Sequence, residues 1–175
     1  IIEALDAFIE HRREVVIRRT KFLLEKAEDR AENLEAFLLA LGHLDDFIQI
    51  IRDSKNRDEA RERLKAYKFS VKTAESLGVL IRDQPSIDGD EYIFTDRQVN
   101  SILELRLYQL TAMERDKIKA DYDNVIEEIK DLLDILDKEA RVLEIIKTDL
   151  LEIKEKHATP RRCPILPDEG EIGIE

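Results

Sequence analysis

The sequence predicts an all-α fold, in which a long antiparallel two-helix coiled-coil arm carries a small globular helical tip. Two long segments, residues 1–41 and 111–158, contain neither Pro nor Gly, and their apolar residues recur with the spacing of a coiled-coil seam. Every Gly and every Pro occurs at Gly42 or later, so turn signals separate the two segments and follow the second. The composition agrees, because 39% charged residues, 6% aromatic residues and no Trp favour an elongated molecule over a large globular core.

Residues 1–41 are predicted to form the outgoing helix of the arm. Its seam steps by three and four residues through Ile17, Thr20, Leu24, Ala27, Ala31, Leu34, Leu38 and Leu41. Three of these side chains are small, and we expect them to face larger ones, since a packed seam must fill its volume without overlap. The first segment therefore needs a second helix beside it.

Residues 111–158 are predicted to form the returning helix, which at 1.5 Å per residue is about 70 Å long. Thr111 and Glu114 have the spacing of a capping box at its start. The predicted seam runs through Tyr122, Ile126, Ile129, Leu133, Leu136, Ala140 and Leu143 and, after a stammer, through Ile146, Leu150, Ile153 and His157. Because so long a helix needs a partner, we expect it to return antiparallel to residues 1–41.

Residues 42–110 are predicted to form the helical tip, and residues 159–175 a linker or tail. Gly42 is a plausible left-handed helix stop, while Asn56 and Thr95 are predicted helix caps with Glu59 and Gln98 three positions on. Ser70 is a further candidate cap for a short helix that ends near Gly78, and residues 92–94 are expected to be extended. The Pro-punctuated segment after Thr159 ends helicity, and the acidic residues 168–175 read as linker.

The sequence offers no catalytic, cofactor-binding or metal-binding motif. Cys163 is the single cysteine, and neither a Gly-rich phosphate loop nor a nucleophile elbow is present. None of the three His follows a Glu at the spacing of a helical di-metal site. No apolar run is long enough for a membrane helix, and no signal peptide is visible. We expect a non-catalytic fragment of a longer protein, since the chain opens at Ile1 already in helical phase.

The formal charge of −11 argues against generic nucleic-acid binding, yet the charges are unevenly distributed. Cations gather near one end of the predicted arm, at Arg12, Arg13, Arg18, Arg19 and Lys21. The returning helix is acidic along its shaft. This basic root is either a DNA-proximal surface or a solvated helical face with intrahelical ion pairs, and charge alone favours the second interpretation.

Two blocks of sequence resemble a known family. They are FIEHRREVVIRRTKFLLEKAEDRAENLEAFLLAL (8–41) and FTDRQVNSILELRLYQLTAMERDKIKADY (94–122), the second of which is similar to the family pattern T-x-x-Q-A-x-A-I-L-x-L-R-L-x-x-L-T. The matching residues are Thr95, Gln98, Ile102, Leu103, Leu105, Arg106, Leu107, Leu110 and Thr111. Val99 and Ser101 stand where the family often has alanine. The chain thus resembles, up to about Arg162, the coiled-coil arm of bacterial type IIA DNA topoisomerase A subunits, with DNA gyrase preferred and topoisomerase IV second.

The resemblance implies a part of an ATP-dependent enzyme that passes one DNA duplex through another to change supercoiling. Two arms would meet at their tips as a homodimer that forms the C-gate, through which the transported duplex leaves. The catalytic tyrosine, and the ATP and Mg²⁺ held by other domains and by a gyrase B-type ATPase partner, would lie outside this chain. The family acts on double-stranded DNA in the cytoplasm, at the nucleoid, with no membrane partner.

The candidate dimer contact is an apolar patch at the tip, for which we select Leu38, Leu41, Leu44 and Phe47. Ile102 and Leu105 are possible supports for that patch. Two alternatives remain open at the level of sequence: a topoisomerase IV arm, which would serve decatenation, and a free-standing antiparallel coiled-coil adaptor.

Overall fold

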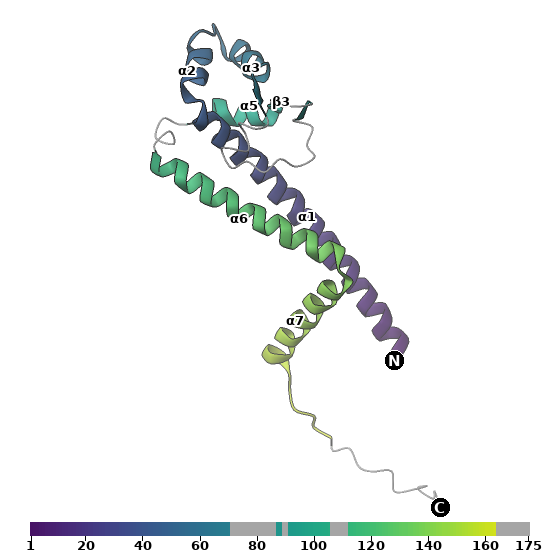
Figure 1. Cartoon of the computed structure of the whole chain (residues 1–175). Helices are drawn as coiled ribbons and strands as arrows, with labels where there is room; N and C mark the ends of the chain where they lie inside the picture. Colours follow the sequence, from purple (N-terminus) through teal and green to yellow (C-terminus); the bar gives the residue numbers. More distant parts are fainter. Residues whose placement is uncertain (71–86, 89–90, 106–111, 164–175) are drawn as a thin grey trace, which may run out of the picture.

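The computed structural model describes residues 1–70, 87–88, 91–105 and 112–163, and it confirms the all-α class. The long helix α1 (Ile2–Gly42) lies antiparallel beside α6 (Ala112–Asp137), and α1 packs mainly against this helix. The tip sits at the far end of this pair, and α7 (Glu139–His157) leaves α6 at an angle (Figure 1).

Helix α1 buries the predicted seam. Thr20, Ala27, Ala31, Leu34, Leu38 and Leu41 are buried, while Ile17 and Leu24 are half-buried. The Thr20 hydroxyl donates to the Val16 carbonyl 2.9 Å away, so this seam position carries no unpaired polar group. The helix ends one residue later than predicted. The chain turns at His43, whose φ of −128° is not left-handed, so the turn does not use the conformational freedom of Gly42.

The tip combines short helices with a small antiparallel sheet. Its elements are α2 (Leu44–Arg52), α3 (Arg57–Lys65), β1 (Lys68–Ser70), β2 (Ile87–Asp88), β3 (Glu91–Ile93) and α5 (Asp96–Leu103). The sheet order is β1-β3-β2, with Phe69 and Ile87 both in register with Tyr92. Both predicted caps are confirmed: Asn56 accepts from the Glu59 N–H at 2.8 Å, and Thr95 and Gln98 form a full capping box. Ser70, a predicted helix cap, is instead the last residue of β1, while residues 71–78 of that predicted helix and the predicted cap at Thr111 fall outside the described residues.

The returning segment is two helices rather than one, which corrects the prediction of a continuous helix over 111–158. Lys138, between α6 and α7, has φ −113° and ψ 108°, and it interrupts the helix without any Pro or Gly. The predicted seam is right at Tyr122, Ile126, Ile129 and Ile146, half-buried at Leu136, and wrong at its other positions beyond Ile129. The buried residues there are Leu132, Ile135, Val142 and Ile146, whereas Leu133, Ala140 and Leu143 are exposed. Two successive steps of three after Ile129 rotate the buried face, and the break resets its phase.

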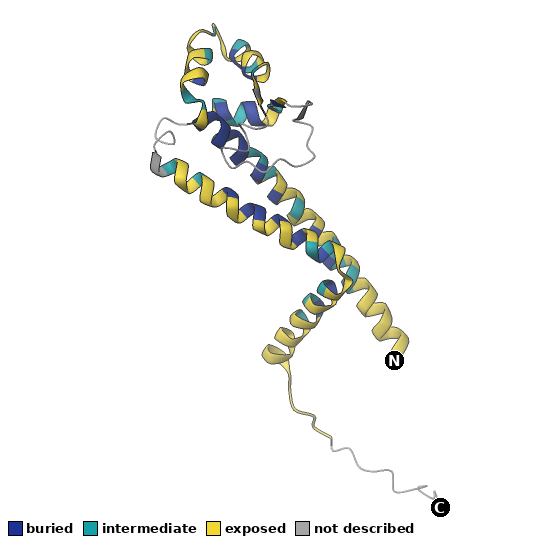
Figure 2. Cartoon of the chain, in the orientation of Figure 1, coloured by how far each residue is buried: buried dark blue, intermediate teal, exposed yellow. Residues whose placement is uncertain are grey.

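Apolar burial is concentrated toward the tip. The main core joins residues 27–40 of α1, the tip helices and strands, and residues 122–132 of α6. A small second cluster, made of Val16, Ile135, Val142 and Ile146, fixes the point where α1, α6 and α7 meet. Beyond that point both α7 and the first residues of α1 are mostly exposed (Figure 2).

Candidate functional site

The structure places most of the predicted dimer residues inside the tip's own core. Leu38, Leu41 and Phe47 are buried, and Leu44 is half-buried. The Phe47 ring lies 5.4 Å from the Tyr67 ring and 5.8 Å from the Phe94 ring, centroid to centroid. Aromatic pairs at such distances are a stabilising core contact. These side chains therefore hold α2 on the tip.

The apolar surface that α2 presents to solvent is made mainly by two residues outside the predicted patch. Ile48 and Ile51 are 40% and 41% exposed, and with Leu44 they occupy positions i, i+4 and i+7 of one helix face. Sequence reasoning did not select Ile48 and Ile51. The available signal was an excess of apolar residues, because a nine-residue helix has more of them here than one core-facing stripe requires.

The two predicted supports belong to the core of the tip. Ile102 is buried in the main core, and Leu105 packs against it half-buried. Hydrogen bonds then attach α5 to α1: the fully buried Gln98 amide donates to the Tyr92 hydroxyl (2.6 Å) and to the Glu32 carbonyl (3.1 Å). The Thr95 hydroxyl donates to the Glu32 carboxylate at 2.5 Å. Every buried polar group named here has a partner, as a rigid tip requires.

Arg97 adds a charged contact between α5 and α1. Its guanidinium bonds the Asp29 carboxylate and lies 3.4 Å from Glu32 Oε2. The hydrogen bond with Asp29 is the main reason that the pKa of Arg97 is raised. On the other side of α5, Asp96 accepts from Arg61 and Lys65, each at 3.1 Å, and these bonds lower the pKa of Asp96.

A buried polar pair joins the two long helices below the tip. The Tyr122 hydroxyl donates to Glu35 Oε1 at 3.0 Å, and both residues are almost fully buried. Sequence reasoning treated Tyr122 as a packing residue of the seam, which the structure confirms, but it missed Glu35. The hydrogen bond links α1 to α6 inside the arm. Removal of the Tyr122 hydroxyl would leave the buried Glu35 side chain with fewer hydrogen-bond donors, which is costly in the protein interior.

The five predicted cations of the basic root separate into two groups. Arg12 pairs with Asp149 of α7 at 2.9 Å, and Arg13 pairs with Glu139 at 2.7 Å and with Glu10 at 2.9 Å. Arg18, Arg19 and Lys21 are exposed and form no ion pair within the described part of the chain. Arg12 and Arg13 therefore tie α7 to α1, and only the other three are available to an outside anion.

Ion pairs also surround the helix break. Arg141 of α7 reaches Asp131 at 2.7 Å and Asp134 at 3.8 Å on α6, and Lys138 bonds Asp134. The bond with Lys138 lowers the pKa of Asp134, and the same bond raises the pKa of Lys138. These ion pairs therefore connect α6 and α7 across the break.

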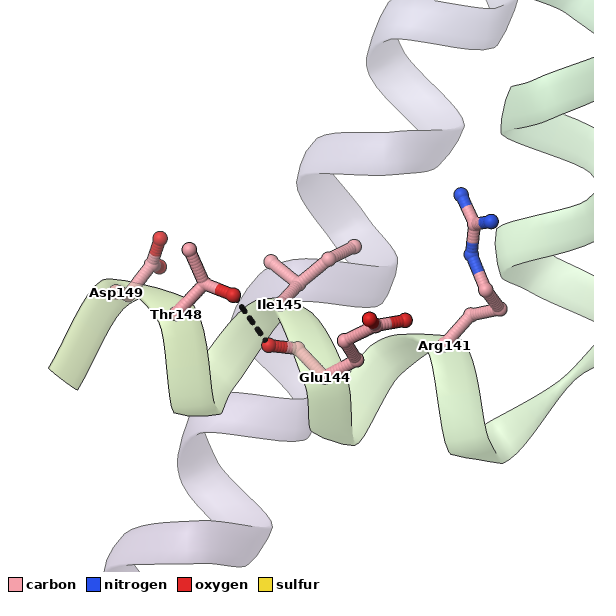
Figure 3. A pocket seen from close by; sticks show the side chains of 5 residues that line it. All are labelled: Arg141, Glu144, Ile145, Thr148 and Asp149. Carbon is pink, nitrogen blue, oxygen red and sulfur yellow. Dashed lines mark hydrogen bonds between the residues drawn. The ribbon is translucent and has the colours of Figure 1, made fainter. Parts of the chain in front are cut away.

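A recess lies beside this cluster, and most of its polar side chains are already paired. It measures about 310 Å³ and is lined by Arg141, Glu144, Ile145, Thr148 and Asp149 (Figure 3). The Thr148 hydroxyl is occupied by the Glu144 carbonyl at 2.9 Å, while Arg141 and Asp149 have the ion-pair partners given above. Across the described residues, no group of three His, Cys, Asp or Glu side chains could hold a metal ion. No helix among them has the length and apolarity to span a membrane.

The tyrosines of the described segments are poor nucleophiles. Tyr92 and Tyr122 are buried, with their hydroxyls in the hydrogen bonds described above. The Tyr67 hydroxyl donates to Asp46 at 2.8 Å, and partial burial together with this bond raises its pKa. A raised pKa reduces the fraction of phenolate, the reactive form.

Comparison with known proteins gives a consistent result. The family model for the A subunit of DNA gyrase/topoisomerase IV matches residues 1–151. The DNA gyrase A subunit of Streptococcus pneumoniae is 42% identical over 164 residues, covering 94% of this chain and 17% of the relative. The Helicobacter pylori protein of the same name is 39% identical over 175 residues, 100% of this chain and 18% of the relative. The Haemophilus influenzae protein is 35% identical over 180 residues, 99% of this chain and 20% of the relative. The chain spans at most about a fifth of the length of these curated relatives.

Proposed function

Because the chain belongs to the DNA gyrase/topoisomerase IV A-subunit family, we propose that it is the arm and dimerising gate of a type IIA DNA topoisomerase. Two arms meet at their tips and hold the enzyme together while a duplex is cut. The contact then opens to release the transported duplex. ATP, Mg²⁺, the catalytic tyrosine and a gyrase B-type ATPase partner belong to parts of the enzyme outside this chain, which works in the cytoplasm at the nucleoid.

One observation carries this proposal: the tip presents an exposed apolar face on a core that is otherwise well satisfied. Leu44, Ile48 and Ile51 form that face, and Phe47 anchors the same helix in the main core. A small apolar contact of this kind can hold two protomers and still separate, unlike an interface along the whole arm. The acidic shaft of α6 would repel a passing duplex rather than retain it.

DNA gyrase remains preferred over topoisomerase IV, since the relatives described above are gyrase proteins, although the family model includes both. A free-standing adaptor gives no reason for a match that extends over residues 1–151.

The dimer contact is tested by sedimentation equilibrium of the 175-residue chain over a wide concentration range. We expect a dimer whose dissociation constant rises at least about thirtyfold in the Ile48→Glu/Ile51→Glu variant, as for the loss of a central contact worth about 2 kcal/mol. Leu133→Glu is the control, because Leu133 is at least as exposed but lies on α6. Circular dichroism checks that helicity is retained. Equal dissociation in both variants, or a monomer throughout, contradicts the proposal.

A further inference from the structure

The exposed apolar face of α2 has two opposite charges along one of its borders. Leu44, Ile48 and Ile51 are spaced four and then three residues apart, as in the seam of a coiled coil. Asp45 and Arg52 directly follow the first and the last of them, and both side chains are exposed. Because seven residues make almost two helical turns, these two charges lie on the same side of α2.

The two charges have no partner within one copy of the chain. Neither Asp45 nor Arg52 forms an ion pair or a side-chain hydrogen bond among the residues whose structure is described. The neighbouring acid Asp46 differs, because it accepts a hydrogen bond from the Tyr67 hydroxyl at 2.8 Å. The opposite border of the apolar face is closed by Phe47, which is buried in the main core. A partner that binds this face therefore meets one acid and one base beside it.

We propose that α2 packs antiparallel against α2 of a second copy, and that Asp45 of each copy forms an ion pair with Arg52 of the other. This inference rests on the proposed function, because it takes the tip as the place where two copies meet. A two-fold axis perpendicular to a helix makes its two copies antiparallel, and every contact is then reciprocal. Leu44 lies opposite Ile51 of the other copy, the two copies of Ile48 meet at the centre, and the ion pair forms twice.

The charges distinguish this orientation from a parallel one. In a parallel pair, Asp45 would face Asp45 and Arg52 would face Arg52, and like charges across an interface are unfavourable. Charged residues beside the seam decide partner choice and orientation in coiled coils for the same reason. Exposed ion pairs add only modestly to affinity, so these two fix the register of the contact and still allow it to open.

The same residues also suit the dipole of their own helix. Asp45 lies in the first turn of α2 and Arg52 in the last, where an acid and a base are stabilising within a single chain. A test must therefore separate an effect inside one helix from a contact between two copies.

Two charge-reversed variants of the 175-residue chain, Asp45→Arg and Arg52→Asp, separate these effects. In a dimer of either variant alone, both ion pairs become like-charge contacts, whereas a dimer with one copy of each variant regains two opposite-charge pairs. By sedimentation equilibrium, we expect a dissociation constant about tenfold above that of the parent for each variant alone, and within about threefold of the parent for the equimolar mixture. A dipole effect predicts no recovery on mixing, since each helix keeps its own altered charge.

Asp123→Arg on α6 and Lys147→Asp on α7 are the matched controls, because they make the same changes in charge at exposed positions outside α2. Both should dimerise as the parent does, alone and mixed. Single variants as tight as the parent, a mixture as weak as the single variants, or controls weakened to the same extent would each overturn the inference.

The gate itself is judged by the apolar variant. A parent chain that stays monomeric contradicts the gate and this inference together. Dissociation of Ile48→Glu/Ile51→Glu, with no effect of the two charge reversals, refutes the antiparallel ion pairs alone and leaves the gate supported.

Discussion

Glu35 and Tyr122 show how much a single polar pair contributes to the arm. A carboxylate in the interior of a helix pair has lost its water, and the Tyr122 hydroxyl replaces part of that hydration at 3.0 Å. The pair also fixes which residues of α1 and α6 face each other, because the hydrogen bond forms in one register only. We infer that it contributes specificity as well as stability.

Removal of the Tyr122 hydroxyl should therefore destabilise the chain. We expect Tyr122→Phe to lower the free energy of unfolding by about 1–3 kcal/mol, because the buried carboxylate loses a donor. Tyr67→Phe is the matched control: its hydroxyl bonds Asp46 at the surface, and a smaller loss is expected. Urea unfolding followed by circular dichroism measures both. Equal losses in the two variants would mean that burial of Glu35 is of little importance.

Asp96 gives the tip a dependence on pH. Its pKa is lowered by hydrogen bonds from Lys65 and Arg61, so its stabilising effect is fully present above the unfolded pKa of about 4 and is lost as pH falls through the lower folded value. We expect Asp96→Asn to remove part of the loss of thermal stability that the chain shows below about pH 4. Asp123→Asn, an exposed carboxylate on α6, serves as the control and should leave that acid profile unchanged. If thermal stability depended on pH in the same way in Asp96→Asn and in the parent chain, the predicted role of Asp96 would be contradicted.

At the scale of elements, features that are determined by residues close in sequence were predictable, and features that depend on distant contacts were not. The caps at Asn56 and Thr95 were predictable because a cap is formed by residues three positions apart. The seam of α1 was predictable because one face is buried along its whole shared length. Ile48 and Ile51 were not selected, since a pattern of apolar residues does not tell a core-facing side chain from one facing a partner.

The break at Lys138 was beyond prediction for a different reason. The local sequence has no helix-breaking residue, and the interruption is held by contacts from elsewhere: Val16 packs against α6 and α7, while Arg13 reaches Glu139. Tertiary contacts of this kind override helix propensity, which is worth only tenths of a kcal/mol per residue. The seam between Ile129 and the break was misplaced for another reason, since two successive steps of three residues rotate the buried face before Lys138 is reached.

Arg141 should hold the angle between α6 and α7. We expect Arg141→Gln to broaden the distance distribution between spin labels at positions 123 and 155, because the bridges to Asp131 and Asp134 across the break are lost. Cys163, which is exposed, is first replaced by Ser. Arg115→Gln, an exposed arginine of α6 with no ion pair inside the described ranges, is the control. Distributions of equal width in the parent and Arg141→Gln would show that packing alone sets the angle.

At the scale of the whole molecule, the exposed cations of α1 stand out against an acidic chain. The chain has a formal charge of −11, yet Arg18, Arg19 and Lys21 are exposed on α1, in the segment for which the sequence predicts a DNA-proximal surface. Arg12 and Arg13 are engaged by α7 and add little to that surface. A DNA contact in this region of the proposed enzyme therefore depends on Arg18, Arg19 and Lys21.

We expect Arg18→Glu/Arg19→Glu to weaken duplex binding by the full-length protein and to reduce the slope of log affinity against log salt by about 2, since each phosphate contact adds about 0.9. Arg115→Glu/Lys119→Glu makes the same change in charge near the tip and should leave that slope unaltered. Fluorescence anisotropy at several salt concentrations measures both. Identical slopes in the parent protein and the Arg18→Glu/Arg19→Glu variant would mean that these arginines contact solvent and not DNA.

Helix α1 runs unbroken for 41 residues, about 60 Å, between the end where it diverges from α7 and the end where it enters the tip. Such a rod magnifies rotation. A turn of about 5° at its base moves its far end by about 5 Å, a distance close to a whole helical turn of 5.4 Å and beyond the reach of any van der Waals contact. Two arms that tilt by so little would lose the apolar contact between their tips completely. The mechanical advantage of one continuous helix thus allows a gate to be worked by very small motions far from it.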